Sequence, residues 1–444
     1  MEALLNLVEN YKDLILEAER YIWEHPETGF REVNTSKYMA EKFKSLGYDN
    51  LIMAGNIPGF YTVVDTGREG PEVLILAELD SLIVPNHKEC DKKTGYVHAC
   101  GHNAQCAAIL GIAAALKEKS VLDRLNGRVR LCLVPAEELI EIEYRNELKK
   151  QGNIKYLGGK GEFLYRGYFD GVDMAFMVHT SGAFVIENGS IGCVAKKIKY
   201  KGVSAHAGGN PDLGVNALYA ASQGLSAANA LRETFKEKDL IRFHPIITHG
   251  GEAVNAIPET VTIESFVRGA TFEAIIRENK KINRALCGAA VSIGANVEIE
   301  DFPGYAPLHN DKGMMELSVN ALKIVAPNET FYRTNDVSRG STDMGELCSL
   351  MPVVHPYAGG AVGKGHGDDY YISDPYKSCV LSAKWQLAML IMLLENGACL
   401  AKEIIKNFKP GFSSKEEYFD YIDKINSSGA RIEYNENGTI TVSP

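Results

Sequence analysis

The chain has 444 residues, and this length predicts two domains because single hydrophobic cores stop growing at roughly 250–300 residues. Its 45% hydrophobic and 23% charged residues are typical of a soluble globular protein. The net charge of −10 argues against nucleic acid and against an anionic membrane surface as partners.

The cysteines and the N-terminal residues indicate in which cellular compartment the protein is expected. Nine cysteines are scattered without paired spacing, and any complete pairing would leave one over. A disulfide framework is therefore not expected, and a cytoplasmic location is favoured. The stretch Met1–Leu5 has no basic region and no long apolar segment after it, so no signal peptide is predicted. No apolar run approaches the length of a membrane span, so no membrane partner is expected.

The first quarter of the chain alternates helices and strands. Apolar residues at helical spacing predict helices over residues 3–25 and 34–47. Strands are predicted over 59–64 and 72–77, and the second is almost wholly apolar, as expected of a strand buried on both faces of an α/β sheet. It runs into Asp80. Groups that bind ligands gather at the carboxyl ends of strands in such sheets, although a turn or a helix cap would also explain this Asp.

A turn holding a thiol and an imidazole follows. Cys100 and His102 flank Gly101, and residues 104–116 form an apolar run of strong helix formers. A loop held by a packed helix would fix both donor atoms, and a helix N-terminus favours the thiolate. The two side chains therefore suit a metal ligand pair. The alternative is a small buried cysteine beside a hydrogen-bonded histidine.

Two further apolar strands end in polar side chains. Residues 129–134 lead into Glu137 and Glu138, and adjacent carboxylates at a strand end are costly unless a cation holds them. A divalent metal would meet this need, and a solvated turn is the alternative. Residues 172–178 end in His179, whose place at a third strand end favours a ligand over a structural role.

The order of predicted helices and strands changes near residue 190. Residues 139–168 are polar and Gly-rich and are predicted to form a surface excursion. After them a β-α-β-β-α-β pattern, the ferredoxin-like arrangement, is inserted into the α/β domain. The final long helix is expected over residues 376–406. The predicted divisions are residues 1–190 and 304–406 for the two parts of the α/β domain, 191–303 for the insertion, and 407–444 for an extension without recognisable chemistry.

Potential metal donors recur at the strand ends and loops of one sheet. They are Asp80, Cys100, His102, Glu137, Glu138, His179 and His366, the last in a Gly-rich loop. A set of thiolate, imidazole and carboxylate donors suits Zn²⁺, Mn²⁺ or Co²⁺ and is too soft for Mg²⁺ or Ca²⁺.

With these residues in view, the sequence resembles the dinuclear metallopeptidases and amidohydrolases that include glutamate carboxypeptidase, aminoacylase, hippurate hydrolase, indole-acetyl-amino-acid hydrolases and aminobenzoyl-glutamate hydrolase. The resemblance covers roughly residues 5–400. Its motifs follow the family's order: Glu78–Leu82, His98–Asn103, Pro135–Glu138, Met177–His179, Ser204–Ala207, Pro211, Gly214–Ala217, Gly250–Gly251, Asn255–Pro258, Arg268, Gly340–Gly345 and His366.

The resemblance implies a fold and a centre with two metal ions. The fold is α/β, with a three-layer αβα catalytic domain and an inserted ferredoxin-like lid and dimerisation domain, so a homodimer is expected. The ions implied are Zn²⁺ or Mn²⁺, with Co²⁺ or Ni²⁺ as alternatives. The ligands implied are Cys100, His102, Glu138, His179 and His366.

The resemblance also implies roles in catalysis and substrate binding. Glu137 looks like the general base that takes a proton from the attacking water, and Asp80 like the carboxylate that orients a ligand. His206 resembles a residue that crosses a dimer interface to stabilise the oxyanion. Asn255 and Arg268 resemble residues that hold the substrate near the scissile bond or by its carboxylate, although a salt-bridged strand end would also explain the arginine.

The chain departs from the family at a few positions. Asn103 stands where many relatives have Asp, and Gln105 where they have His. Together with the stretch Val354–Tyr357, this asparagine is similar to the branch of aminobenzoyl-glutamate hydrolase and of dipeptidases with a basic C-terminal residue. Glu78 stands where the carboxypeptidase branch has His, which fits the branch that uses Cys100.

Three hypotheses follow for function. The first is metal-dependent hydrolysis of the amide bond of a small N-acyl amino acid, dipeptide or aminobenzoyl-glutamate-like substrate. The second is a catalytically inactive relative that binds such a molecule, although no ligand and no base is missing from the sequence. The third is a hydrolase in which Cys100 is the nucleophile beside His102, which predicts inactivation by alkylation and no dependence on metal.

Overall fold

The computed structural model describes residues 1–426 and 432–443 and divides into two compact units. The first unit contains residues 1–189, 308–338 and 342–415, and the second contains 190–307, 339–341 and 416–444. Each unit has its own hydrophobic core.

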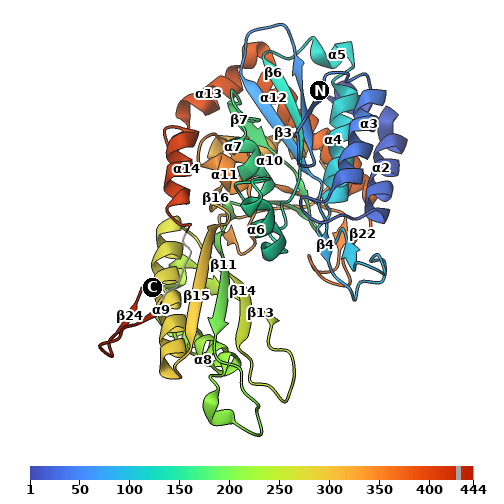
Figure 1. Cartoon of the computed structure of the whole chain (residues 1–444). Coiled ribbons are helices and arrows are strands. Elements are labelled where there is room, and N and C mark those ends of the chain that lie inside the picture. Colours follow the sequence, from blue (N-terminus) through green and yellow to red (C-terminus); the bar gives the residue numbers. More distant parts are fainter. Residues whose placement is uncertain (427–431, 444) are drawn as a thin grey trace. The chain divides into compact units, whose positions relative to one another are not determined.

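A six-stranded sheet forms the centre of the first unit (Figure 1). Its order is β1 (Ile52–Met53), β2 (Phe60–Asp65), β6 (Arg128–Val134), β3 (Glu72–Glu78), β7 (Met174–Phe176) and β19 (Val353–Val354). The strands β6, β3, β7 and β19 run parallel, and β2 is antiparallel to β6. All residues of β3 are buried, as its apolar composition predicts.

Helices cover both faces of this sheet. On one face Val73, Ile75 and Ala77 of β3 share a core with α2 (Lys12–Glu24), α3 (Val33–Ser45), α4 (His102–Ala115), α10 (Lys312–Val325) and α12 (Ser382–Leu394). Because side chains alternate along a strand, Glu78 points away from this core, toward α7 (Gly159–Tyr165), beside which lies α11 (Met344–Cys348). The predicted three-layer αβα arrangement is confirmed.

The second unit has the predicted βαββαβ order. Its elements are β11 (Gly192–Lys201), α8 (Ala217–Ala230), β12 (Arg242–Phe243) with β13 (Ile246–His249), β14 (Thr260–Gly269), α9 (Phe272–Ser292) and β15 (Asn296–Pro303). The strands are antiparallel in the order β12-β14-β11-β15, and β13 also pairs with β14. This is the ferredoxin-like arrangement.

The predicted surface excursion over residues 139–168 is wrong. The segment forms α6 (Ile142–Lys150) and α7, and the Arg145 and Lys160 side chains within it are buried. The Arg145 guanidinium donates to the carbonyl oxygens of Ala136, Glu138 and Leu157, so it links α6 to the loop after β6. The polar composition of the segment predicted exposure. Composition alone does not show that these polar side chains are buried with hydrogen-bond partners.

The predicted helix over 376–406 is broken. It runs from Tyr376 through Leu394, stops where Gly397 takes a left-handed φ of 70°, and resumes as α13 (Cys399–Asn407). The sequence predicted no apolar run long enough to cross a membrane, but Tyr376–Leu394 is long and apolar enough to do so. In the structure 83% of its apolar stretch is buried. Its apolar side chains therefore belong to the core of the first unit.

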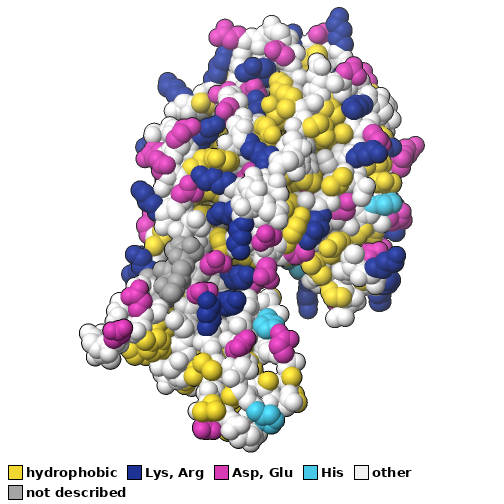
Figure 2. Space-filling view, viewed as in Figure 1, with side chains coloured by type: hydrophobic (Ala, Val, Ile, Leu, Met, Phe, Trp, Pro, Cys, Tyr) yellow, Lys and Arg dark blue, Asp and Glu magenta, His cyan; other side chains and the backbone are white. Residues whose placement is uncertain are grey.

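The C-terminal extension belongs to the second unit from residue 416 onward. It contains α14 (Lys415–Asp423) and a hairpin of β23 (Ile432–Tyr434) and β24 (Ile440–Val442). The Tyr434 hydroxyl donates to the Ala295 carbonyl at 2.6 Å, and the hairpin thereby lies against β15. On the face drawn in Figure 2, acidic and basic side chains are interspersed.

Candidate metal centre and active site

The ends of three neighbouring strands bring the predicted donors of the first unit together. Asp80 follows β3, Glu137 and Glu138 follow β6, and His179 follows β7. Because β6, β3 and β7 are adjacent and parallel, their carboxyl ends meet at one edge of the sheet. The site is thus a direct consequence of the order of three apolar strands.

The turn before α4 adds a thiol and an imidazole at the same edge. The helix begins at His102, and Gly101 before it has a left-handed φ of 87°. A Cβ atom on this glycine would lie 2.0 Å from the Thr180 Oγ1 atom, so only glycine fits. The close approach holds Cys100 next to β8 (His179–Thr180), and the Cys100 Sγ atom lies 3.5 Å from the His179 Nε2 atom.

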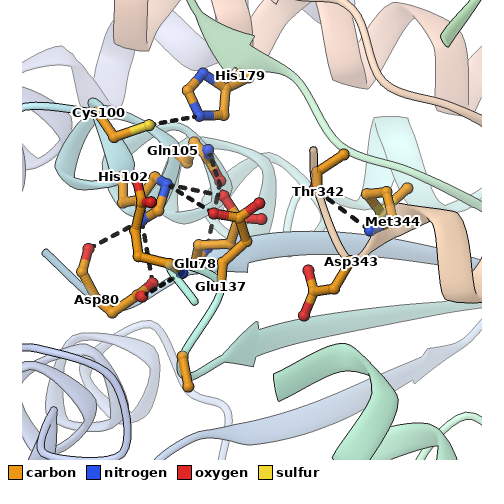
Figure 3. Close-up of polar contacts among 12 residues, drawn as sticks. Glu78, Asp80, Cys100, His102, Gln105, Glu137, His179, Thr342, Asp343 and Met344 are labelled. Carbon is orange, nitrogen blue, oxygen red and sulfur yellow. Dashed lines mark hydrogen bonds and ion pairs between the residues drawn. The ribbon is translucent and has the colours of Figure 1, made fainter. Parts of the chain in front are cut away.

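The His102 ring is fixed on one side, and its other nitrogen faces two carboxylates (Figure 3). Its Nδ1 atom lies 2.9 Å from the Asp80 carbonyl oxygen and 3.1 Å from Oδ1 of the same residue, so this nitrogen donates its proton there. The buried Nε2 atom makes no hydrogen bond, although carboxylate oxygens of Glu78 and Glu137 lie 3.3 and 3.8 Å away. A nitrogen lone pair that faces carboxylate oxygens is the arrangement a cation would stabilise.

Three sets of three donors could each hold an ion, and within each set the donor atoms lie within 4.8 Å of one another. Two sets contain Cys100, one with His102 and His179 and the other with Glu138 and His366, and together they include all five predicted ligands. The third set is Glu78, His102 and Glu137. Metal–ligand distances of about 2.0–2.3 Å place two ligands of one Zn²⁺ roughly 3.2–3.8 Å apart. The 3.5 Å between Cys100 and His179 and the 3.2 Å between the Glu138 Oε1 and His366 Nε2 atoms match this spacing. The residues therefore fit a pair of ions that share the thiolate.

Electrostatics favour the ionised thiol and carboxylate. Burial and the Glu138 carboxylate raise the pKa of Cys100, but the His179 and His102 imidazoles outweigh them and lower it to about 6. Burial also raises the pKa of Glu138, and His366 outweighs that effect and holds the pKa well below its usual value. Both groups are thus in the form that binds metal at neutral pH.

The loop after β6 separates the two adjacent glutamates. Ala136 has a left-handed φ of 58°, a strained conformation held by a 2.7 Å hydrogen bond from its N–H to the Glu32 Oε1 atom. Glu138 then joins His366, whereas Glu137 lies in a different group with Glu78 and His102. Burial and the Glu78 and Glu138 carboxylates raise the pKa of Glu137 well above its ordinary value.

Asn103, which departs from the motif expected of the family, has a buried partner on α2. Its Nδ2 atom donates to the Glu19 Oε1 atom at 2.7 Å, and both side chains are buried. Burial raises the pKa of Glu19 to about 7, against the opposing effects of Arg20 and of the Asn103 hydrogen bond. An aspartate at position 103 would face this glutamate, so the asparagine is matched to its neighbour.

Asn103→Asp should destabilise the fold in a pH-dependent way. At pH 8, above the pKa of Glu19, two buried carboxylates would face each other, and we expect a loss of about 1–3 kcal/mol in the free energy of unfolding. At pH 5 the pair can share a proton, so the loss should be smaller. The sign follows because the folded state binds the extra proton, and stability then falls as pH rises through 7. Urea unfolding at both pH values measures this.

A compensating variant provides the control. In Asn103→Asp with Glu19→Gln the amide and carboxylate exchange places, and stability at pH 8 should return to within about 0.5 kcal/mol of the wild type, the range of a neutral substitution. A loss that is equal at pH 5 and pH 8, or that the second substitution does not restore, would contradict the assigned pairing.

Three predicted site residues lie in the second unit. His206 is exposed, and its Nδ1 atom accepts the Gly209 N–H at 2.8 Å, so the neutral ring carries its proton on Nε2. Asn255 is exposed on the neighbouring segment, where its carbonyl accepts the Ala207 N–H at 2.9 Å. Arg268 is half-buried on β14, and its Nη1 atom donates to the Ser341 Oγ atom at 3.2 Å.

Four buried polar residues beside the centre were given no role from the sequence. They are Glu78, Gln105, Lys160 and Asp343. The signal for Lys160 is the glycine before it: a Cβ atom on Gly159 would lie 1.7 Å from the Pro135 carbonyl oxygen. This close approach brings the start of α7 to the end of β6.

Comparison with known proteins identifies the family. Residues 74–390, more than half of the chain, match the model of peptidase family M20/M25/M40. Thermostable carboxypeptidase 1 of Saccharolobus solfataricus is 26% identical over 372 residues, which cover 81% of this chain and 89% of that protein. One component of the p-aminobenzoyl-glutamate hydrolase of Escherichia coli is 28% identical over 287 residues, 62% of this chain and 55% of the relative.

A solved structure agrees with the fold. A Bacillus subtilis protein described as a dinuclear metal-binding peptidase of the M20 family superimposes with a TM-score of 0.63 at 21% identity, over 87% of this chain and 99% of that one. The predicted resemblance is confirmed. The chain belongs to peptidase family M20/M25/M40 and is a hydrolase of linear amide or peptide bonds.

Proposed function

We propose that this protein uses two divalent ions, Zn²⁺ or Mn²⁺, to hydrolyse the amide bond of a small N-acyl amino acid, a dipeptide or an aminobenzoyl-glutamate-like molecule. The observation that carries the proposal is the pair of donor sets that share Cys100, with Glu137 in an adjoining group. The relatives support the substrate class, since their names include a carboxypeptidase, p-aminobenzoyl-glutamate hydrolase and an Xaa-Arg dipeptidase from Mus musculus.

The ligands in this proposal are Cys100, His102, Glu138, His179 and His366. When bound, the ions would polarise the scissile carbonyl and lower the pKa of the attacking water. Asp80 orients His102 through Nδ1, and its Oδ2 atom accepts the Glu138 N–H at 2.7 Å, so one carboxylate positions a ligand in each set.

Glu137 is the general base in this proposal. The residue is 7% exposed, and in this role its carboxylate accepts the proton of the water and then delivers it to the leaving nitrogen. Glu137 is not one of the five ligands of this proposal, in which its carboxylate transfers protons and does not hold an ion.

The second unit would bind the substrate and complete the site. His206 offers the N–H of Nε2 to the developing oxyanion, a role that needs an exposed ring with Nδ1 already bonded, as found. We infer that it acts on the other protomer of a homodimer, and that Asn255 and Arg268 hold the substrate. The nine cysteines, all within the described residues, form no disulfide there, which supports the inferred cytoplasmic location.

Metal content and turnover test the function together. The purified protein should contain or take up two ions per chain by elemental analysis, and the Mn²⁺- or Zn²⁺-loaded protein should hydrolyse part of a panel of N-acyl amino acids, dipeptides and p-aminobenzoyl-glutamate. Chelation should abolish turnover, and the same ion should restore it. Binding of a panel member without turnover by the loaded protein would establish the inactive-relative hypothesis instead. Turnover that survives chelation would exclude a metal mechanism.

A further inference from the structure

A buried ionic network that the proposed reaction does not use adjoins the metal centre. The Lys160 ammonium donates to the Glu78 Oε1 and Asp343 Oδ1 atoms, and all three side chains are 0% exposed. The Lys160 N–H also donates to the Asp343 Oδ2 atom at 2.8 Å. Burial of three ionised groups is costly, so this network calls for a reason beyond packing.

Glu78 connects this network to the centre. Its Oε1 atom accepts from Lys160. Its Oε2 atom accepts from the Gln105 Nε2 atom at 2.8 Å (Figure 3). With both oxygens held, the carboxylate stays 3.3 Å from the His102 Nε2 atom, which makes no hydrogen bond. Burial alone would raise the pKa of Glu78, but Lys160 and His102 outweigh it and hold the pKa far below its usual value.

The placement of Glu78 is unfavourable for a purely structural ion pair. Its carboxylate shares a 4.8 Å group with Glu137, and two buried carboxylates at this range repel each other. The repulsion is offset when a cation lies at His102.

We propose that Glu78 is a positioning residue of the metal centre: held by Lys160 and Gln105, its carboxylate places a negative charge beside His102 Nε2 and tightens the ion bound there. The inference rests on the proposed function, because it assumes that His102 holds an ion. Groups that support metal ligands typically contribute 10–100-fold in metal affinity. Asp343, the other partner of Lys160, is in none of the donor groups and should contribute little.

Glu78→Gln and Asp343→Asn form a matched pair of variants. Each removes one negative charge from Lys160 and leaves it the other carboxylate, so both should fold. The Gln105 amide can rotate to accept from the new amide in Glu78→Gln. The metal-free full chain is titrated with Zn²⁺ against a chromophoric chelator, and thermal unfolding verifies the fold. We expect two ions in the wild type, one of them bound about 10–100-fold more weakly in Glu78→Gln, and both within about threefold of wild type in Asp343→Asn.

The possible outcomes distinguish a failure of the role proposed for Glu78 from a failure of the proposed metal centre. Equal effects of the two substitutions, or no effect of Glu78→Gln, overturn the role of Glu78. A wild type that binds fewer than two ions overturns the proposed centre instead. If Glu78→Gln does not fold, Gln105→Leu replaces it, because this change frees the Oε2 atom without removing a charge. Weaker binding of one ion then supports the proposal, and wild-type affinity for both ions overturns it.

Discussion

Glu137→Gln should bind both ions with wild-type affinity and lose about 10²–10⁴-fold in kcat, the usual contribution of a general base. The amide has nearly the shape of the carboxylate but cannot accept a proton at neutral pH. KM should change little, because the substitution removes proton transfer and leaves the ligands intact. Steady-state kinetics of the fully loaded variant, with ions counted by elemental analysis, measures all three quantities.

The adjacent residue supplies the control. Glu138→Gln changes the neighbouring side chain in the same way, but Glu138 pairs with His366 in a donor set. This variant should lose one ion, and excess metal should partly restore its rate. Glu137→Gln should not respond to excess metal. A Glu137→Gln variant that keeps more than about a tenth of wild-type kcat, or that loses an ion, would remove Glu137 from the role of base.

The sequence predicted the site best for residues that directly follow a buried strand, because the strand fixes where those residues lie. Apolar strands that end in Asp80, Glu137 and His179 predicted a shared edge, because parallel neighbours in a sheet align their carboxyl ends. His366 carried no such signal. It lies in a Gly-rich loop and has a left-handed φ of 64°, so the order of the strands did not predict where its ring lies.

The ionic network beside the metal centre shows why the other residues of the site were not predicted from the sequence. Lys160 meets Glu78 and Asp343 across sequence separations of 82 and 183 residues. A lysine in a polar, Gly-rich stretch is usually solvated. The neighbouring residues in the sequence do not indicate that this lysine is buried against two carboxylates. The same limit applies to Asn103, whose meaning depends on Glu19 on another helix.

Replacing Cys100 should have the second large effect, because Cys100 is the donor shared by the two sets that contain the five proposed ligands. Cys100→Ala should weaken both ions by more than about 100-fold, beyond the 10–100-fold typical of supporting residues. His366→Ala, which changes one set only, should weaken a single ion. Competition titration with Zn²⁺ measures both variants, and Co²⁺ loading gives a thiolate-to-metal absorption band that Cys100→Ala should lose and His366→Ala should keep.

The same variants decide between a bridging thiolate and a nucleophilic one. A nucleophile would be alkylated equally well with and without metal, whereas a thiolate bound to two ions should be protected when they are present. We therefore expect iodoacetamide to modify Cys100 rapidly only in the metal-free protein, where its pKa of about 6 leaves it mostly ionised at pH 7. Equal modification in both states, together with two tightly bound ions in Cys100→Ala, would show that the ions are held without it and that the two donor sets do not share a ligand.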